Sequence, residues 1–228
     1  MNRRRFAITA LTAFALGGAT KALAASPPAE WDGLSRVKSS RLQNVYLLPG
    51  ADFRPFTKVM LDRTEIAFRK NWQREFNSRT SRGLSGRITD ADIEQMVDDG
   101  GKAATDIFSQ AFAAGGFPVV NAAGPDVLRV RTAVVNLTVT SPDRMTAGRS
   151  RTYSGEAGTA TLVIEARDSV SGALLGRAVD SQVAGDSSIF LNRTQMSNRA
   201  DFRALAQRWA RTAVSGLQQL KGTSPVSG

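Results

Sequence analysis

Two stretches decide the fold: VLRVRTAVVNLTV at residues 127–139 and ATLVIEARDSVSGALLGRAVDSQV at residues 160–183. The first is rich in β-branched residues, and the second begins with apolar and polar residues in alternation, the period of a half-buried strand. Asp168 and Gly172 then supply an Asx-type turn start and a glycine suited to positive φ. We therefore predict a long central strand beside an antiparallel hairpin whose return strand is residues 173–183.

A helix is predicted on each side of these strands. Thr89 followed by Asp92 is typical of a capping box, and apolar residues at helical spacing continue until Gly115-Gly116. The last helix is expected to start at a cap formed by Asn198 and Asp201, and its apolar stripe is centred on Trp209.

These elements predict an α+β fold: a mostly antiparallel sheet with two long helices packed on it. One domain is expected over residues 31–221, preceded by an extended leader at 25–30 and followed by a disordered tail at 222–228.

The first 24 residues are predicted to be a cleaved signal peptide. Arg3-Arg4-Arg5 is a cationic start, residues 6–20 are moderately apolar, and Ala22-Leu23-Ala24 places small residues where a signal peptidase cuts. Residues 2–6 also resemble a twin-arginine signal, so both that route and the general secretory route stay open. The mature protein is expected to be soluble in the periplasm, with no transmembrane segment left after cleavage.

The composition excludes several kinds of chemistry. The chain contains no cysteine and no histidine, which rules out disulfides, thiolate nucleophiles, Ser-His-Asp triads and histidine-zinc sites in this chain alone. The formal net charge is +10, and because residues 1–24 hold four basic residues and no acidic one, it falls to +6 after cleavage. A surplus of this size is compatible with an anionic partner and equally with simple solubility.

Arginines in two polar segments are the candidate anion contacts. Residues 71–87 and 141–158 are expected to be surface loops, because both are rich in serine, threonine and glycine. No ladder of aromatic residues accompanies the arginines, which argues against nucleic acid. The candidates are Arg74, Arg79, Arg82, Arg144, Arg149 and Arg151.

Other segments carry more open predictions. Residues 58–68 change the parity of their apolar residues near Arg63, which indicates either a bulge or two successive elements. Residues 117–121 are predicted to be a short strand. In the central strand, Arg129 and Arg131 point to the face that Val135, Leu137 and Val139 occupy further along. One face is therefore expected to be exposed at the start of the strand and buried at its end, unless a bulge near Ala133 changes the alternation.

Several motifs resemble an exported bacterial family known as domain of unknown function family 3313. The motifs are WDGL at residues 31–34, VYLLPGAD at 45–52, VMLD at 59–62 with Phe68 and Trp72 after it, and GPDVLRVR at 124–131. The resemblance covers most of the mature chain and implies no catalytic residues. Many members look like lipoproteins with a cysteine after the signal, and this chain departs from that pattern.

The function predicted from these observations is non-enzymatic. We expect a binding or assembly accessory of the cell envelope, whose partner is an envelope protein or an anionic envelope component. No catalytic, cofactor or metal residue is predicted. Two alternatives stay open: a binder of anionic polymer or lipid headgroups through the arginine-rich loops, and a hydrolase that uses paired carboxylates.

Overall fold

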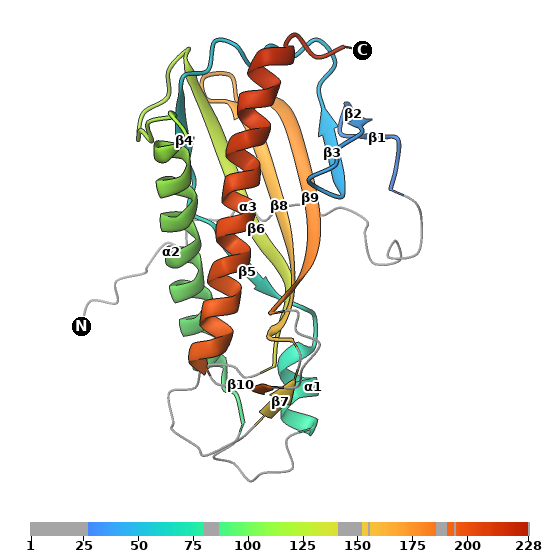
Figure 1. Ribbon diagram of the computed structural model, residues 1–228, viewed down its shortest axis with the longest axis vertical. Helices are drawn as coiled ribbons and strands as arrows, with labels where there is room; N and C mark the ends of the chain where they lie inside the picture. Colours follow the sequence, from blue (N-terminus) through green and yellow to red (C-terminus); the bar gives the residue numbers. More distant parts are fainter. Residues whose placement is uncertain are drawn as a thin grey trace, which may run out of the picture.

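The computed structural model in Figure 1 describes residues 27–79, 87–140, 152–154, 156–185, 191–193 and 195–227. The residues of the predicted signal peptide lie outside these ranges. The described strands are β1 Glu30–Trp31, β2 Leu34–Val37, β3 Asn44–Leu47, β4 Lys58–Leu61, β5 Glu65–Phe68, β6 Val127–Val139, β7 Thr152–Ser154, β8 Gly158–Asp168, β9 Leu174–Ala184 and β10 Leu191–Arg193. The described helices are α1 Trp72–Arg79, α2 Asp90–Ala114 and α3 Gln195–Thr223.

The main sheet has eight strands and is mostly antiparallel. Its order is β1-β2-β3-β9-β8-β6-β4, and β5 also pairs with β6, next to β4 along the same edge. Only β4 and β5 run parallel to their neighbour, which is β6 in both cases. Strands β7 and β10 form a separate antiparallel pair. The fold is therefore a mixed α/β single domain, and among its helices α2 and α3 are the long ones.

The predicted hairpin is present between β8 and β9. The Asp168 carboxylate accepts hydrogen bonds from the backbone N–H groups of Val170 at 2.9 Å and Ser171 at 2.7 Å. Gly172 has a φ of 73°, which a side chain would disfavour. The two strands then pair antiparallel from Gly158 opposite Ala184 as far as the turn.

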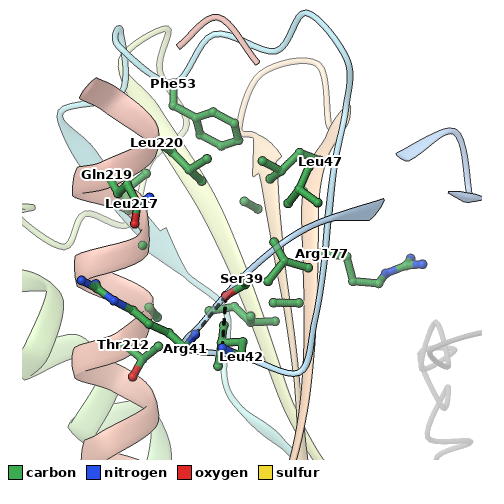
Figure 2. A pocket seen from close by; sticks show the side chains of 18 of the residues that line it. Ser39, Arg41, Leu42, Leu47, Phe53, Arg177, Thr212, Leu217, Gln219 and Leu220 are labelled. Carbon is green, nitrogen blue, oxygen red and sulfur yellow. Dashed lines mark hydrogen bonds between the residues drawn. The ribbon is translucent and has the colours of Figure 1, made fainter. Parts of the chain in front are cut away.

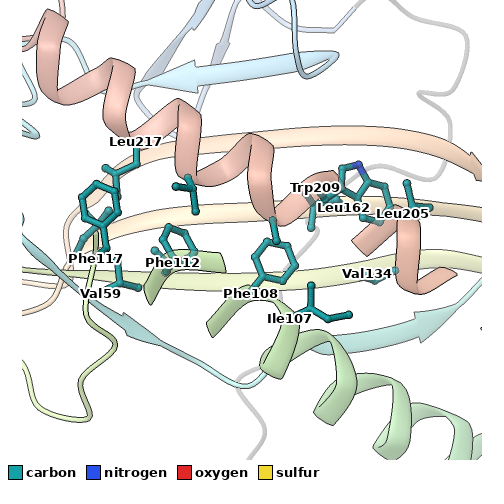
Figure 3. Close-up of a cluster of buried hydrophobic side chains, with 14 of the residues drawn as sticks. Val59, Ile107, Phe108, Phe112, Phe117, Val134, Leu162, Leu205, Trp209 and Leu217 are labelled. Carbon is teal, nitrogen blue, oxygen red and sulfur yellow. The ribbon is translucent and has the colours of Figure 1, made fainter. Parts of the chain in front are cut away.

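Helices α2 and α3 lie side by side on one face of the sheet (Figure 1). The Thr89 hydroxyl accepts from Asp92 N–H while the Asp92 carboxylate accepts from Thr89 N–H, so the predicted capping box starts α2. Phe108 and Phe112 of α2 pack toward Trp209 of α3 and Leu162 of the sheet in one apolar core (Figure 3). All of these side chains are buried, because each helix turns its apolar stripe toward the sheet.

Two ambiguous segments are resolved by the structure. Residues 58–68 form two successive strands, and the break between them holds Thr64, whose buried hydroxyl lies 2.7 Å from that of Thr132. The bulge in β6 lies between Val135 and Thr138, with Asn136 at a φ of 51°, rather than near Ala133. After this bulge Leu137 packs against the core. The extra residue in the bulge is the reason that apolar side chains late in β6 still reach the core face.

Other predictions of element boundaries were wrong. Residues 117–121 do not form a strand, and only Val119 makes a single bridge, to Val59. Helix α3 begins at Gln195, before the predicted cap. Within the predicted disordered tail, the described residues have defined positions: α3 continues to Thr223, and the Val226 backbone exchanges hydrogen bonds with residues 50 and 51. Val226 packs, partly buried, against the core at this position.

Candidate ligand-binding pocket

A cavity of about 390 Å³ lies between α3 and the sheet, beneath the loop that joins β2 to β3 (Figure 2). Its floor is formed by neighbouring strands β6, β8 and β9, its wall by one face of α3, and its roof by residues 37–42. Phe53 lies at the end away from the turn at residues 39–42 (Figure 2), and Phe112 also lines the cavity. The apolar and small residues that line it are Val37, Leu42, Val45, Leu47, Phe53, Phe112, Leu128, Val130, Ile164, Ala166, Gly176, Ala178, Ala213, Gly216, Leu217 and Leu220.

The space exists because small residues face each other across the sheet and the helix. Ala166 and Ala178 present only methyl groups on the floor, Ala213 presents a methyl group on the wall, and Gly216 has no side chain there. A Cβ added at Gly216 would meet no atom within 4 Å. Protein interiors are normally close-packed, and an engineered apolar cavity of about 150 Å³ is already large enough to bind benzene. The volume is therefore within the range of ligand pockets.

The roof is a short turn held by Ser39. The Ser39 hydroxyl accepts hydrogen bonds from the backbone N–H groups of Arg41 and Leu42, both at 3.2 Å. This turn lets Leu42 pack against the core while Arg41 is exposed at the rim. Figure 2 shows the Arg41 side chain extending from the loop toward α3, in the direction of Thr212.

A buried carboxylate connects the roof to the wall. Asp180 of β9 is only 3% exposed, and its Oδ1 accepts from the backbone N–H of Gln43, the residue after the roof, at 3.1 Å. Its Oδ2 accepts from the indole N–H of Trp209 on α3 at 2.8 Å and from the Gln182 side chain at 3.0 Å. Three N–H donors thus satisfy a carboxylate that would otherwise be costly to bury.

The charge around the pocket is one-sided. Lys38, Arg41 and Arg177 are its charged lining residues, and no acidic residue lines it. In Figure 2 the Arg177 side chain points away from the cavity. Lys38 and Arg41 are both exposed, and among the described residues no carboxylate forms an ion pair with either of them.

The opposite face of the sheet, which neither α2 nor α3 covers, carries a network of ion pairs. Glu165, 2% exposed, accepts from Arg177 at 2.7 Å and from Arg167 at 2.9 Å. Arg177 also pairs with Asp32 at 2.7 Å and lies 4.3 Å from the centre of the Trp31 ring.

The same network continues to the edge of the sheet. Arg131 contacts Glu165 at 3.9 Å and Asp62 at 3.4 Å, and Asp62 also binds Arg129 through two carboxylate oxygens. These acidic residues are each matched by an arginine, so their arrangement is that of a structural network.

Hydrogen bonds lower the pKa of several carboxyl groups among the described residues. A hydrogen bond from Arg63 is the main reason that the pKa of Asp98 lies below its usual value, and Arg54 and Lys58 have the same effect on the pKa values of Asp52 and Asp126. A general acid needs a raised carboxyl pKa. These carboxyl groups are thus suited to ion pairing, and the carboxylate-hydrolase alternative gains no residue from them.

The predicted arginine sites are only partly described. Arg74 and Arg79 are exposed on α1, which corrects the expectation of a loop over residues 71–87. A helix forms there because Trp72 is buried and stacks on Phe68, with ring centres 4.5 Å apart. Arg82, Arg144, Arg149 and Arg151 lie outside the described residues, so the patch that the six arginines would form stays a prediction.

Sequence reasoning missed the residues that build this pocket. Lys38 and Arg41 bracket two serines between the apolar residues Val37 and Leu42, a short basic turn that could have been noted as a rim. The small residues on the helix and the strands gave no comparable signal. Within the described ranges, no group of acidic side chains could hold a metal ion, and no helix is long and apolar enough to cross a membrane.

Comparison with known proteins identifies a family and no activity. The profile of the family described as "Protein of unknown function (DUF3313)" matches residues 23–213, which confirms the resemblance seen in the sequence motifs. No curated protein matches the chain.

Three solved structures show distant similarity. The PelC dodecamer from Paraburkholderia phytofirmans is 15% identical, with 73% of this chain and 96% of that chain covered and a TM-score of 0.35. A DUF330 protein from Xanthomonas campestris is 13% identical, with coverage of 77% and 91% and a TM-score of 0.36. A protein from Helicobacter pylori described as a neuraminyllactose-binding hemagglutinin homologue is 10% identical, with coverage of 76% and 96% and a TM-score of 0.33. These values are too low to bear on function.

Proposed function

This chain belongs to the DUF3313 family of proteins of unknown function, and we propose that it is a non-enzymatic binding protein of the cell envelope that holds an apolar ligand in the pocket between α3 and the sheet. The observation that carries this proposal is the cavity of about 390 Å³ with its apolar lining. Burial of apolar surface is the main driving force that such a pocket offers a ligand.

The surroundings of the pocket favour binding over catalysis. The polar lining residues with neutral side chains are Ser39, Ser40, Thr212, Gln219 and Thr223, which are hydrogen-bonding groups without an activating base. No acidic residue lines the pocket, and acidic groups elsewhere are held in ion pairs; at Asp98, hydrogen bonds from Arg63 and Lys102 lower the carboxyl pKa. The roof is tied to β9 and α3 through Asp180, and this gives the pocket a defined shape before any ligand arrives.

Export is part of the proposal and rests on the sequence of residues 1–24. A protein that meets its ligand in the envelope must cross the inner membrane, and the cationic start, apolar stretch and small cleavage-site residues suit that task. Intact-mass measurement of the protein from a periplasmic fraction should give a chain that begins at Ala25 or Ser26. A full-length mass would contradict export with cleavage.

Binding can be tested with an uncharged apolar dye such as N-phenyl-1-naphthylamine, whose fluorescence rises in an apolar site. The mature protein should bind the dye saturably, and Gly216→Leu should weaken binding at least about tenfold because the new side chain enters open space in the cavity. Gly222→Leu is the matched control, since Gly222 also lies in α3 with nothing within 4 Å but does not line the cavity. No binding by the parent protein, or equal loss in both variants, would contradict the proposal.

A further inference from the structure

We infer that the ligand is a single-chain amphiphile with an anionic head, whose chain occupies the cavity and whose head lies at Lys38 and Arg41. This inference rests on the proposed function and adds the chemical class of the ligand. It follows from the charges at the rim, the volume of the cavity and the position of the Arg41 side chain.

The rim places cations without a carboxylate partner beside apolar space. Other exposed arginines, such as Arg203 and Arg208, also form no ion pair within the described residues, but they do not line the cavity. At the rim, Lys38 and Arg41 stand within four residues of each other, and no acidic residue lines the cavity. An anionic head would supply the missing opposite charge, and a cationic head would be repelled.

The volume of the cavity sets the size of the apolar part. If about 150 Å³ holds the six carbons of benzene, then 390 Å³ has room for roughly fifteen carbons by proportion. That is one hydrocarbon chain of medium length, and a second chain would exceed the space. Most of the lining residues are apolar, and the hydroxyls of Thr212 and Thr223 donate to backbone oxygens of α3, so these two groups have partners without a ligand.

The position of Arg41 places a positive charge where the chain would emerge. The Ser39 turn holds the Arg41 backbone in the roof, and its side chain extends toward α3 across from Thr212 (Figure 2). A guanidinium group can bind a carboxylate or a phosphate through two hydrogen bonds, while Lys38 adds a second charge from the same loop. Carboxylate and phosphate heads are thus both compatible with the rim.

The experiment compares four twelve-carbon ligands that differ only in their heads. Dodecanoate, monododecyl phosphate, dodecanol and dodecyltrimethylammonium are titrated against the dye-loaded mature protein below their micelle concentrations, and displacement of the dye is measured. The two anions should bind at least about tenfold more tightly than the alcohol, and the cation should bind most weakly. The stronger of the two anions identifies the preferred head.

Variants and shorter ligands distinguish the contribution of the head to affinity from that of the hydrocarbon chain. Lys38→Gln combined with Arg41→Gln should reduce the affinity for both anions to that for dodecanol and leave dodecanol unchanged. Arg203→Gln, at an exposed position of α3 away from the cavity, should change neither. Shortening the anions from twelve to ten carbons should weaken binding about fourfold per carbon, because each carbon buries one methylene group.

The outcomes for the two proposals are distinguishable. Equal affinity for all four heads, or no effect of the double variant on the anions, would overturn the inference while dye binding still supports an apolar pocket. No binding of the dye or of any chain would overturn both. Competition by inorganic phosphate alone, equal to that of dodecyl phosphate, would also overturn the inference, because the chain would then contribute nothing.

Discussion

The two faces of the sheet differ in how their charged side chains are paired. On the face without α2 and α3, arginines are neutralised by carboxylates, and Glu165 and Arg177 are almost fully buried in the process. On the helix-covered face, the charges at the pocket rim have no carboxylate beside them among the described residues. Paired charge contributes to the structure of this protein, whereas unpaired charge next to an apolar cavity is available to a ligand.

The strongest way to break the helix-covered face is Trp209→Ala. Trp209 is 3% exposed, and the change removes a large core side chain and one of the donors to Asp180. The free energy of unfolding should fall by about 3–5 kcal/mol. Denaturant unfolding measures this, and a loss below about 1 kcal/mol would mean that the core does not depend on this residue.

On the other face, Glu165→Ala should have the next largest effect. It leaves the buried Arg177 with Asp32 as its remaining ion-pair partner and the half-exposed Arg167 without its carboxylate. Breaking a buried pair costs about 3–5 kcal/mol, and because Arg177 keeps Asp32 we expect a value near 3 kcal/mol. A loss no larger than that of a surface variant such as Asp52→Ala would show that the network is not structural.

A smaller and opposite effect is expected at the pocket itself. Gly216→Ala should raise the free energy of unfolding by about 0.5–1 kcal/mol, because alanine favours the helix and its methyl group meets no atom. Gly176 lines the same cavity, but a Cβ there would lie 3.0 Å from Leu47 Cδ2, so Gly176→Ala should not stabilise. Equal stabilisation by both changes would contradict the described geometry of the cavity.

The smallest effect concerns Asp168 and the pH dependence of stability. The hydrogen bond from the backbone N–H of Ser171 is the main reason that the pKa of Asp168 is lowered in the folded protein. A lowered pKa means that this carboxylate stabilises the fold above its unfolded pKa of about 4 and loses that contribution as the pH falls through the folded value. Asp168→Asn should therefore flatten the decline of stability between pH 5 and 3, measured by denaturant unfolding. An unchanged decline would assign the acid sensitivity to other groups.

The fold could be predicted where the signal was local. The β8–β9 hairpin and the start of α2 each depend on a few neighbouring residues, such as Asp168 with Gly172 and Thr89 with Asp92, and these patterns specify their own geometry. Helix α1 was missed because its signal is the stacking of Trp72 on Phe68, a contact with the preceding strand. The polar composition of residues 71–87 instead led to the prediction of a loop.

The pocket could not be predicted because it depends on distances between separate elements. Hydrophobic periodicity shows which face of a helix is buried, but it does not show whether the opposing side chains meet. Gly216 and Ala178 are 38 positions apart, and only the packing of α3 on β9 makes their small size a cavity. The burial of Glu165 likewise depends on other elements: Arg177 pairs with it, and the ring of the distant Trp31 lies against Arg177.

Asp180 makes two distant N–H groups dependent on one acceptor. The backbone N–H of Gln43 and the indole N–H of Trp209 donate to the same carboxylate, from positions 137 and 29 residues away. We therefore expect the hydrogen–deuterium exchange rates of these two N–H groups to change together. A motion that moves the loop at residues 37–43 away from Asp180 would also weaken the hydrogen bond between Asp180 and Trp209 of α3. A ligand that fills the cavity would slow both exchange rates. The signal of the Trp209 indole N–H on α3 would then report that a ligand is bound, even beneath the loop on the other side of the pocket.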